Sequence, residues 1–186
     1  MAAGVTLAFA LPLAGDAASA EKSTAPVQGE FSFTSTEHCV YAPAFGPPPL
    51  LQANGPATLQ TSTLQGTLSL AQDGTGRLIG RIASLQSASD TGATPAMQSS
   101  LTCAVTHGFA AKGELHLERT CRGTRLRGTG SEIAQTWEAS VVRESGQLSA
   151  ETTVLADTQI AVESLSVAGV SFARICHRTS WMTKKK

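Results

Sequence analysis

Polar and apolar residues alternate along most of the chain after Gly29, and short glycine-containing segments interrupt the alternation. Successive side chains of a strand point to opposite faces, so a period of two predicts β-strands with one buried face. After the first twenty residues, no window of helical length carries an apolar stripe with a helical period. The pattern therefore predicts an all-β domain of antiparallel strands.

Turn sequences divide the alternating segments into hairpins. Asp73-Gly74 supplies the positive-φ positions that a tight turn needs, and it predicts a hairpin of strands at 57–71 and 77–84. The polar stretch at 86–100 that follows predicts a surface loop. Earlier in the chain, Pro47-Pro48-Pro49 favours an extended loop without the hydrogen bonds of a strand ladder.

Two of the four cysteines lie near the ends of another predicted hairpin. With a turn at 111–113 and Gly113 in the left-handed conformation, Cys103 stands directly opposite Cys121. Opposed cysteines on neighbouring strands have Cα atoms within disulfide reach. The spacing therefore predicts a Cys103–Cys121 disulfide that staples the hairpin.

The same segment also has a spacing that superficially matches a zinc ligand set, formed by Cys103, His107, His116 and Cys121. On extended strands, however, His107 shares the face of the two cysteines, whereas His116 points the other way. Only a shifted register or a helical segment would bring the histidines together. We expect no metal site, and the absence of a C-x-x-C pair argues against catalytic redox use.

The remaining cysteines, Cys39 and Cys176, lie just after the first predicted strand and within the last one. These strands become neighbours if the sheet closes into a barrel, so a Cys39–Cys176 disulfide would tie the closing seam. We therefore expect a disulfide-stapled, up-and-down β-barrel of about eight to ten strands. It is expected to occupy residues 29–182, with a basic tail at 183–186.

Two hairpins complete the predicted meander. Residues 143–146 are expected to form a loop, and Ala168-Gly169 a tight turn that sets Glu163 opposite Arg174. An ion pair on an apolar face inside a barrel must be hydrogen-bonded. It is interpreted first as a structural cross-strand bridge, and second as an anchor for a polar or anionic group of a ligand.

Several side chains are expected on the inner face and are candidate ligand contacts. His107 and Arg119 also have simpler interpretations, as a core histidine and as an arginine that caps the mouth of the barrel. The candidates are Phe33, His107, Arg119, Trp137, Glu163, Phe172 and Arg174.

The first twenty residues have the pattern of a secretory leader. An apolar run at 5–13 is followed by Ala18-Ser19-Ala20, a site that signal peptidase recognises, although no basic residue precedes the run. We expect a chain that starts near Glu21, with a flexible segment at 21–28, in the periplasm or outside the cell. The apolar run is too short for a permanent membrane span.

Charge and motifs narrow the function classes. Fourteen basic residues balance fourteen acidic ones, and no basic stripe with interleaved aromatics suggests a nucleic-acid partner. The chain has no nucleophile elbow, no H-E-x-x-H zinc motif and no phosphate-binding loop. No catalytic residue and no cofactor is predicted, and an enzyme is the least favoured hypothesis.

Four segments together resemble a group of small exported bacterial proteins of unassigned function. They are the opening GEFSFT from Gly29, the cysteine with its Pro-rich loop, the hairpin QDGTGRLIGR and the closing VESLSVAGVSFARICHR. The resemblance covers most of the chain after the predicted leader and implies a calycin-like or allene-oxide-cyclase-like barrel. It implies no catalytic residue, and Cys103 and Cys121 look like an addition specific to this chain.

Two function hypotheses follow. In the first, the barrel binds a small, largely apolar ligand in its lumen. In the second, side chains fill the barrel, and the protein is a structural or interaction component of the cell envelope or extracellular matrix, with homo-oligomerisation left open. Low aromatic content, 5% of the residues, and several inward alanines leave room in the lumen and favour the first.

Overall fold

The computed structural model describes residues 27–87, 96–110, 113–127, 135–139 and 142–186. The expected leader and most of the expected flexible segment lie outside these ranges. Val27, which the sequence places in that flexible segment, is buried against the apolar core. No helix in the described part of the chain is long and apolar enough to cross a membrane.

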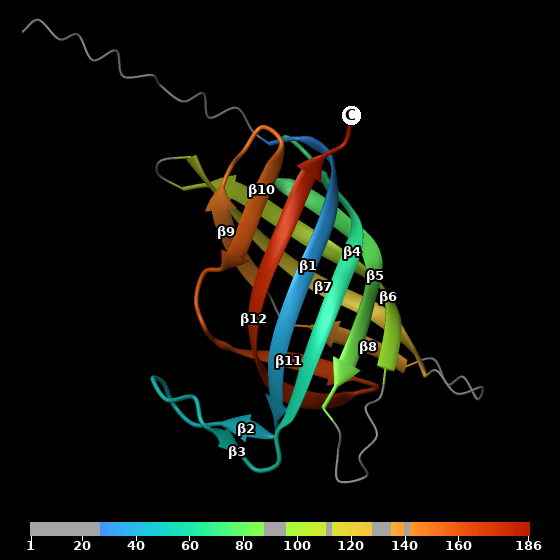
Figure 1. Ribbon diagram of the computed structural model, residues 1–186, viewed down its shortest axis with the longest axis vertical. Helices are drawn as coiled ribbons and strands as arrows, with labels where there is room; N and C mark the ends of the chain where they lie inside the picture. The colour runs from blue at the N-terminus through green and yellow to red at the C-terminus, as the bar shows by residue number, and fades with distance from the viewer. Residues whose placement is uncertain (1–26, 88–95, 111–112, 128–134, 140–141) are drawn as a thin grey trace, which may run out of the picture.

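Ten antiparallel strands form one sheet that closes on itself (Figure 1). β1 pairs with β4 along one side and with β12 along the other, which closes the ring. The predicted antiparallel β-barrel is confirmed. Its strands are β1 (Gly29–Ala42), β4 (Thr58–Leu70), β5 (Thr75–Gln86), β6 (Ala96–Phe109), β7 (Glu114–Arg127), β8 (Gln135–Ala139), β9 (Val142–Gln147), β10 (Thr152–Asp157), β11 (Val162–Val167) and β12 (Val170–Lys184).

Two short strand pairs fill the wall between β7 and β12. The first part of β7 pairs with β9 and its later part with β8, while β12 pairs first with β11 and then with β10. The pairs β9–β10 and β8–β11 therefore occupy opposite ends of this wall (Figure 1). Among the described strands, a circuit around either end of the barrel crosses eight strands. β8 and β9 occupy the two ends of one position in the ring, and β11 and β10 occupy the two ends of the next position.

A second, two-stranded sheet lies outside the ring at the end where β1 finishes (Figure 1). It consists of β2 (Ala44–Phe45) and β3 (Ala53–Asn54). Residues 47–50 between them form a bend and a turn rather than the extended loop that three consecutive prolines predict.

Both predicted disulfides are present, each between directly opposed residues of neighbouring strands. Cys103 pairs with Cys121 with Cα atoms 4.0 Å apart, and Cys39 pairs with Cys176 with Cα atoms 4.1 Å apart. The second bond joins the first and last strands of the ring, as the seam argument predicts. Gly113 has φ +73°, the left-handed conformation expected for the turn residue of the β6–β7 hairpin.

Apolar side chains fill one end of the lumen. They come from alternate positions of the strands, as the period of two predicts. The largest members of this cluster are Phe31, Phe33, Leu64, Leu68, Leu78, Leu101, Leu115, Leu117, Leu155 and Met182. These side chains pack against one another and occupy this end of the lumen.

Besides the Gly113 turn, two further turn predictions are confirmed and one is wrong. Gly74 and Ala168-Gly169 have positive φ in the two tight turns. Residues 143–146, however, belong to strand β9, and the chain turns later, between Gln147 and Thr152. A loop at 143–146 would place Leu148 and Val154 on the inward apolar face, but Leu148 is 43% exposed and Val154 is 49% exposed. The true inward residue is Glu144, whose charge made it resemble a loop residue.

Two strand boundaries also differ from the sequence prediction. β6 begins at Ala96, so the predicted loop at 86–100 is shorter than expected, and Met97 is buried despite its polar neighbours. β12 extends to Lys184, so the basic tail begins later than residue 183. The main chain of Lys185 still donates a hydrogen bond to the Glu30 carbonyl.

We predict that Gly66→Ala destabilises the barrel by about 2 kcal/mol or more. A Cβ at Gly66 would lie 2.4 Å from the Ile79 carbonyl oxygen, a main-chain atom that cannot rotate away. Gly108→Ala is the control, because its Cβ would meet nothing within 4 Å. Urea unfolding measures both variants, and equal stability losses would contradict this packing argument.

Candidate functional site

A layer of charged side chains crosses the lumen beside the apolar core. It contains four carboxylates and three arginines, contributed by β1, β7, β9, β10, β11 and β12. We call these residues the lumen ion network: Glu37, Arg119, Glu144, Asp157, Glu163, Arg174 and Arg178. Burying a charge is costly unless it is paired and hydrogen-bonded, so the pairing of each member decides whether the layer is tolerated.

Arg119 connects the network to the apolar core. Its Nε lies 3.0 Å from Glu144 Oε2, and its Nη2 lies 3.2 Å from Glu37 Oε1. The Ser180 hydroxyl donates to the other oxygen of Glu144. The guanidinium carbon stands 5.7 Å from the centre of the Phe33 ring, within cation–π range. Arg119 is thus held by two charges and one aromatic face.

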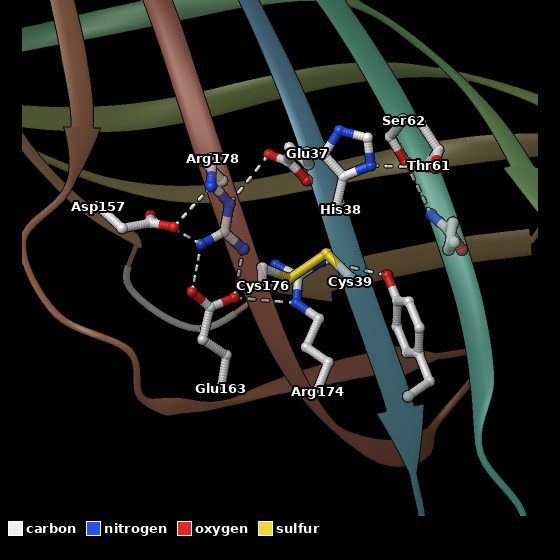
Figure 2. The surroundings of a disulfide bond; sticks show 12 residues. Glu37, His38, Cys39, Thr61, Ser62, Asp157, Glu163, Arg174, Cys176 and Arg178 are labelled. Carbon is white, nitrogen blue, oxygen red and sulfur yellow. Dashed lines mark hydrogen bonds and ion pairs between the residues drawn. A yellow bond between two sulfur atoms is a disulfide. The ribbon is translucent and has the colours of Figure 1, made fainter.

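Arg178 is the most deeply paired arginine, with only 1% of its side chain exposed. Its Nη1 and Nη2 each lie 2.5 Å from an oxygen of Glu163, a two-pronged contact (Figure 2). Its Nε lies 3.2 Å from Glu37, and its Nη1 lies 3.3 Å from Asp157. Asp157 also accepts a hydrogen bond of 2.7 Å from the Arg178 main-chain N–H. Three strands thus supply carboxylates to one guanidinium.

Arg174 extends the network toward the open end of the lumen. It stands opposite Glu163 in the β11–β12 hairpin, as the sequence predicts, and its Nε lies 3.0 Å from Glu163 Oε2. Its Nη1 donates to the Tyr41 hydroxyl at 3.4 Å. The Cys39–Cys176 disulfide crosses the seam between Arg174 and Arg178 (Figure 2). The predicted ion pair is therefore real, but Glu163 makes its shortest contacts with Arg178.

Burial and pairing act in opposite directions on the pKa values of four members of the network. Burial alone would raise the pKa of Glu37, but Arg178, Arg119 and Arg174 outweigh it and lower the pKa to about 2. Burial would lower the pKa values of Arg119 and Arg178, and the neighbouring carboxylates more than offset this and raise both. Burial raises the pKa of Asp157, and Arg178 cancels only part of that effect. Glu37 is thus a fixed charge at neutral pH, not a general base.

A pocket opens on the other side of the network, at the end of the barrel where the β11–β12 hairpin turns. It has an outer part of about 560 Å³ and an inner chamber of about 60 Å³. The two parts share lining residues, so they are adjacent, and we call them together the mouth pocket. The shared residues are Tyr41, Gln60, Arg125, Leu165 and Val167.

The two parts of the mouth pocket differ in chemistry. Phe172, of which 41% is exposed, lines the outer part together with Val170 and the Gln86 and Gln135 side chains. The inner chamber is bounded by the aromatic ring of Trp137 and by charged groups of Glu37 and Arg174. A molecule that enters the pocket would therefore meet apolar and amide groups together with Arg125 in the outer part, and Glu37 and Arg174 only in the inner chamber.

The predicted site residues separate into three groups. Trp137, Arg174 and Phe172 line the mouth pocket. Glu163 and Arg119 belong to the ion network. The remaining two, Phe33 and His107, lie elsewhere. Phe33 is part of the apolar core, and His107 Nε2 lies 3.0 Å from the Ala71 carbonyl oxygen, near the β4–β5 turn.

Several residues of the site were missed by the sequence prediction. Glu37 has the same parity as Phe33 on β1, and Arg178 has the same parity as Arg174 on β12, so alternation alone would have found both. Asp157 stands at the end of β10, and no pattern in the sequence announces its role. Glu144 was assigned to a loop.

The zinc alternative loses its ligands in the structure. Cys103 and Cys121 are joined in a disulfide, and His116 lies 3.7 Å from Glu114 on the outer face. Within the described ranges, no group of three or more His, Cys, Asp or Glu side chains is arranged to hold a metal ion.

Comparison of the chain with protein-family models, curated proteins and solved structures finds no match. The resemblance to small exported bacterial barrels therefore stays a prediction.

We predict that Arg178→Met lowers the free energy of unfolding by about 3 to 5 kcal/mol, because it leaves buried carboxylates without their partner. Arg143→Met is the matched control. It breaks the contact of 2.7 Å between Arg143 and Glu118, which are both about half-exposed, and should cost under about 1 kcal/mol. Urea unfolding at pH 7 compares them, and a small loss for Arg178→Met would contradict the pairing.

The low pKa of Glu37 predicts a pH signature. Its folded-state value, about 2, lies below the ordinary 4.5, so the stabilisation is present above pH 4.5 and is lost as the pH falls toward 2. The stability difference between wild type and Glu37→Gln should shrink by on the order of 3 kcal/mol between pH 5 and pH 2.

Leu64→Ala is the control for this titration, because it destabilises the core without removing a carboxylate. Its stability difference from wild type should change little over the same pH range. A constant difference for Glu37→Gln would contradict an ionised, paired Glu37.

Proposed function

We propose that the protein is an exported binding protein that takes up a small, largely apolar molecule in the mouth pocket. The observation that carries this proposal is the division of the lumen. Apolar side chains fill one end, and the other end opens into a pocket of about 560 Å³. This volume lies within the range of about 300–1,000 Å³ that is usual for small-molecule sites.

The wall of the outer pocket suits a ligand with an apolar body. Leu165, Val167, Val170 and Phe172 offer aliphatic and aromatic surface on the β11–β12 hairpin. Amide side chains such as Gln60 add a few polar contacts at intervals. Small-molecule sites commonly combine such apolar walls with a few polar groups that fix orientation.

Export is supported by the cysteines. All four are paired, and such bonds persist in oxidising compartments such as the periplasm or the extracellular space. The leader pattern in the first twenty residues agrees with this location. The proposed ligand is therefore one that occurs in the periplasm or outside the cell.

A structural or interaction role is the second candidate. It is favoured by exposed apolar residues around the same hairpin, where 46% of Val162 and 57% of Val170 are exposed. Such a surface fits a partner protein or a second copy of this chain. The two candidates differ in what they require of the mouth pocket. Ligand binding requires that no protein group fills the pocket, whereas a structural or interaction role does not.

We predict that the protein binds the neutral fluorescent probe N-phenyl-1-naphthylamine and that Leu165→Trp weakens binding at least about tenfold by filling the pocket. Val162→Trp is the control, because Val162 points outward from the same strand. Fluorescence titration gives both dissociation constants, and circular dichroism confirms folding. Probe binding that Leu165→Trp does not weaken would overturn the proposal.

A further inference from the structure

The charged groups around the mouth pocket are all engaged with other residues of the protein. Among the described lining residues, the charged ones are Glu37, Arg125 and Arg174. Two arginines of the lumen ion network hold Glu37, and Glu163 lies 3.0 Å from Arg174. Arg125 is not a free cation either. The four carboxylates of the network equal in number its three arginines taken together with Arg125, so the pocket offers a charged ligand group no counter-ion of its own.

The amide and hydroxyl groups on one wall of the pocket are used within the protein. Gln60 Nε2 donates to the hydroxyls of Ser62 and Ser84, at 2.9 Å and 3.2 Å. The same two hydroxyls lie 2.8 Å apart and share a hydrogen bond. Gln86 Nε2 donates to Gln60 Oε1 at 2.9 Å. Because both protons of the Gln60 amide are taken, this wall has little donor capacity left for a ligand.

Tyr41 provides a donor that is still available. Its hydroxyl oxygen accepts a hydrogen bond of 3.4 Å from Arg174 Nη1, and its own proton has no acceptor among the described residues. A hydrogen bond received from a charged group polarises the hydroxyl and strengthens it as a donor. Tyr41 lines both parts of the mouth pocket, so its proton is offered where the two parts adjoin.

Size separates the two parts. The inner chamber, about 60 Å³, is roughly one tenth of the outer pocket, about 560 Å³. A group as small as an acetyl fits the chamber, whereas the bulk of a ligand has to remain among Leu165, Val167 and Phe172. This arrangement suits a molecule with an apolar body and one small polar end.

We infer that the ligand is an uncharged apolar molecule with one hydrogen-bond-accepting oxygen, of a carbonyl or a hydroxyl group, which takes the proton of Tyr41. Its apolar body lies against the β11–β12 hairpin. An ion of either sign would be buried beside charges that are already paired, which is costly. This inference rests on the proposed function, because it names the chemical class of ligand for the same pocket.

The first test uses three naphthalene probes with planar substituents of nearly equal shape. They are the ketone 2-acetylnaphthalene, the anion 2-naphthoate and the cation naphthalene-2-carboxamidinium. Displacement of N-phenyl-1-naphthylamine at pH 7 gives the three dissociation constants. The ketone should bind at least about tenfold more tightly than either ion. Binding of either ion as tight as that of the ketone overturns the inference.

The second test removes the proposed donor. Tyr41→Phe should weaken the ketone about tenfold and should change little for 2-isopropenylnaphthalene, in which a methylene group replaces the carbonyl oxygen. Circular dichroism confirms folding. Equal losses for the ketone and the alkene overturn the inference.

Ser84→Ala is the control for the second test. It removes another hydroxyl from the lining of the inner chamber, but one that is already used by Ser62 and Gln60. It should leave the ratio of the ketone and alkene dissociation constants unchanged. A change in this ratio as large as that caused by Tyr41→Phe contradicts a specific role of Tyr41.

Binding of the neutral probe N-phenyl-1-naphthylamine separates the two levels of the argument. If it binds and the ketone has no advantage over the ions, the pocket exists and the assigned class of ligand is wrong. If it does not bind, and isothermal titration calorimetry detects no binding of the ketone, the proposed function falls and the inference falls with it.

Discussion

The structure depends on the pairing of one buried arginine, Arg178. Its three carboxylate partners, Glu37, Asp157 and Glu163, come from strands at the beginning and near the end of the chain (Figure 2). β11 and β12 form a local hairpin, but β1 meets β12 only when the ring closes. A slip of one residue would turn inward side chains outward and leave charges unpaired in the lumen. We interpret the network as a device that fixes register, since buried ion pairs add little net stability but are costly to break.

The disulfide of the seam acts on the same strands. Cys39 and Cys176 stand opposite each other two residues from Glu37 and Arg178. A covalent bond between the first and last strands restricts the unfolded chain, while the ion network selects one register in the folded state. Closure and register are thus secured by different physical means at one place in the sheet.

The network also divides the lumen by chemistry. On one side, leucine, phenylalanine and methionine side chains pack as a continuous core. On the other side, the mouth pocket opens between the β11–β12 hairpin and the ends of β1, β4, β5 and β7. The ion network thus gives the pocket a charged floor that contains Glu37 and Arg174, both held by their partners in the network. Preorganised groups of this kind spend less of the binding free energy on ordering.

The sequence predicted much of the fold and only part of the site. Turn chemistry and parity were sufficient for the Cys103–Cys121 disulfide and for the Glu163–Arg174 pair, because these depend on local register. The Cys39–Cys176 disulfide followed instead from the expected closure of the barrel. Glu144 was misplaced because its charge resembles that of a loop residue, and only the long-range contact with Arg119 explains its burial. Among the partners of Arg178, Glu163 lies on β11, which forms a hairpin with β12. Glu37 lies on β1 and meets Arg178 only through closure of the ring, so no local pattern specifies that contact.

The central claim is that the barrel is filled at one end and open to a small molecule at the other. Titration with N-phenyl-1-naphthylamine, followed by amide NMR spectra, tests it most directly because it locates the bound molecule. The account predicts chemical-shift changes at Tyr41, Leu165 and Val167, and little change at Leu68 and Leu78 in the filled end. Changes confined to the outer face of the sheet, or spread through the apolar core, would contradict it.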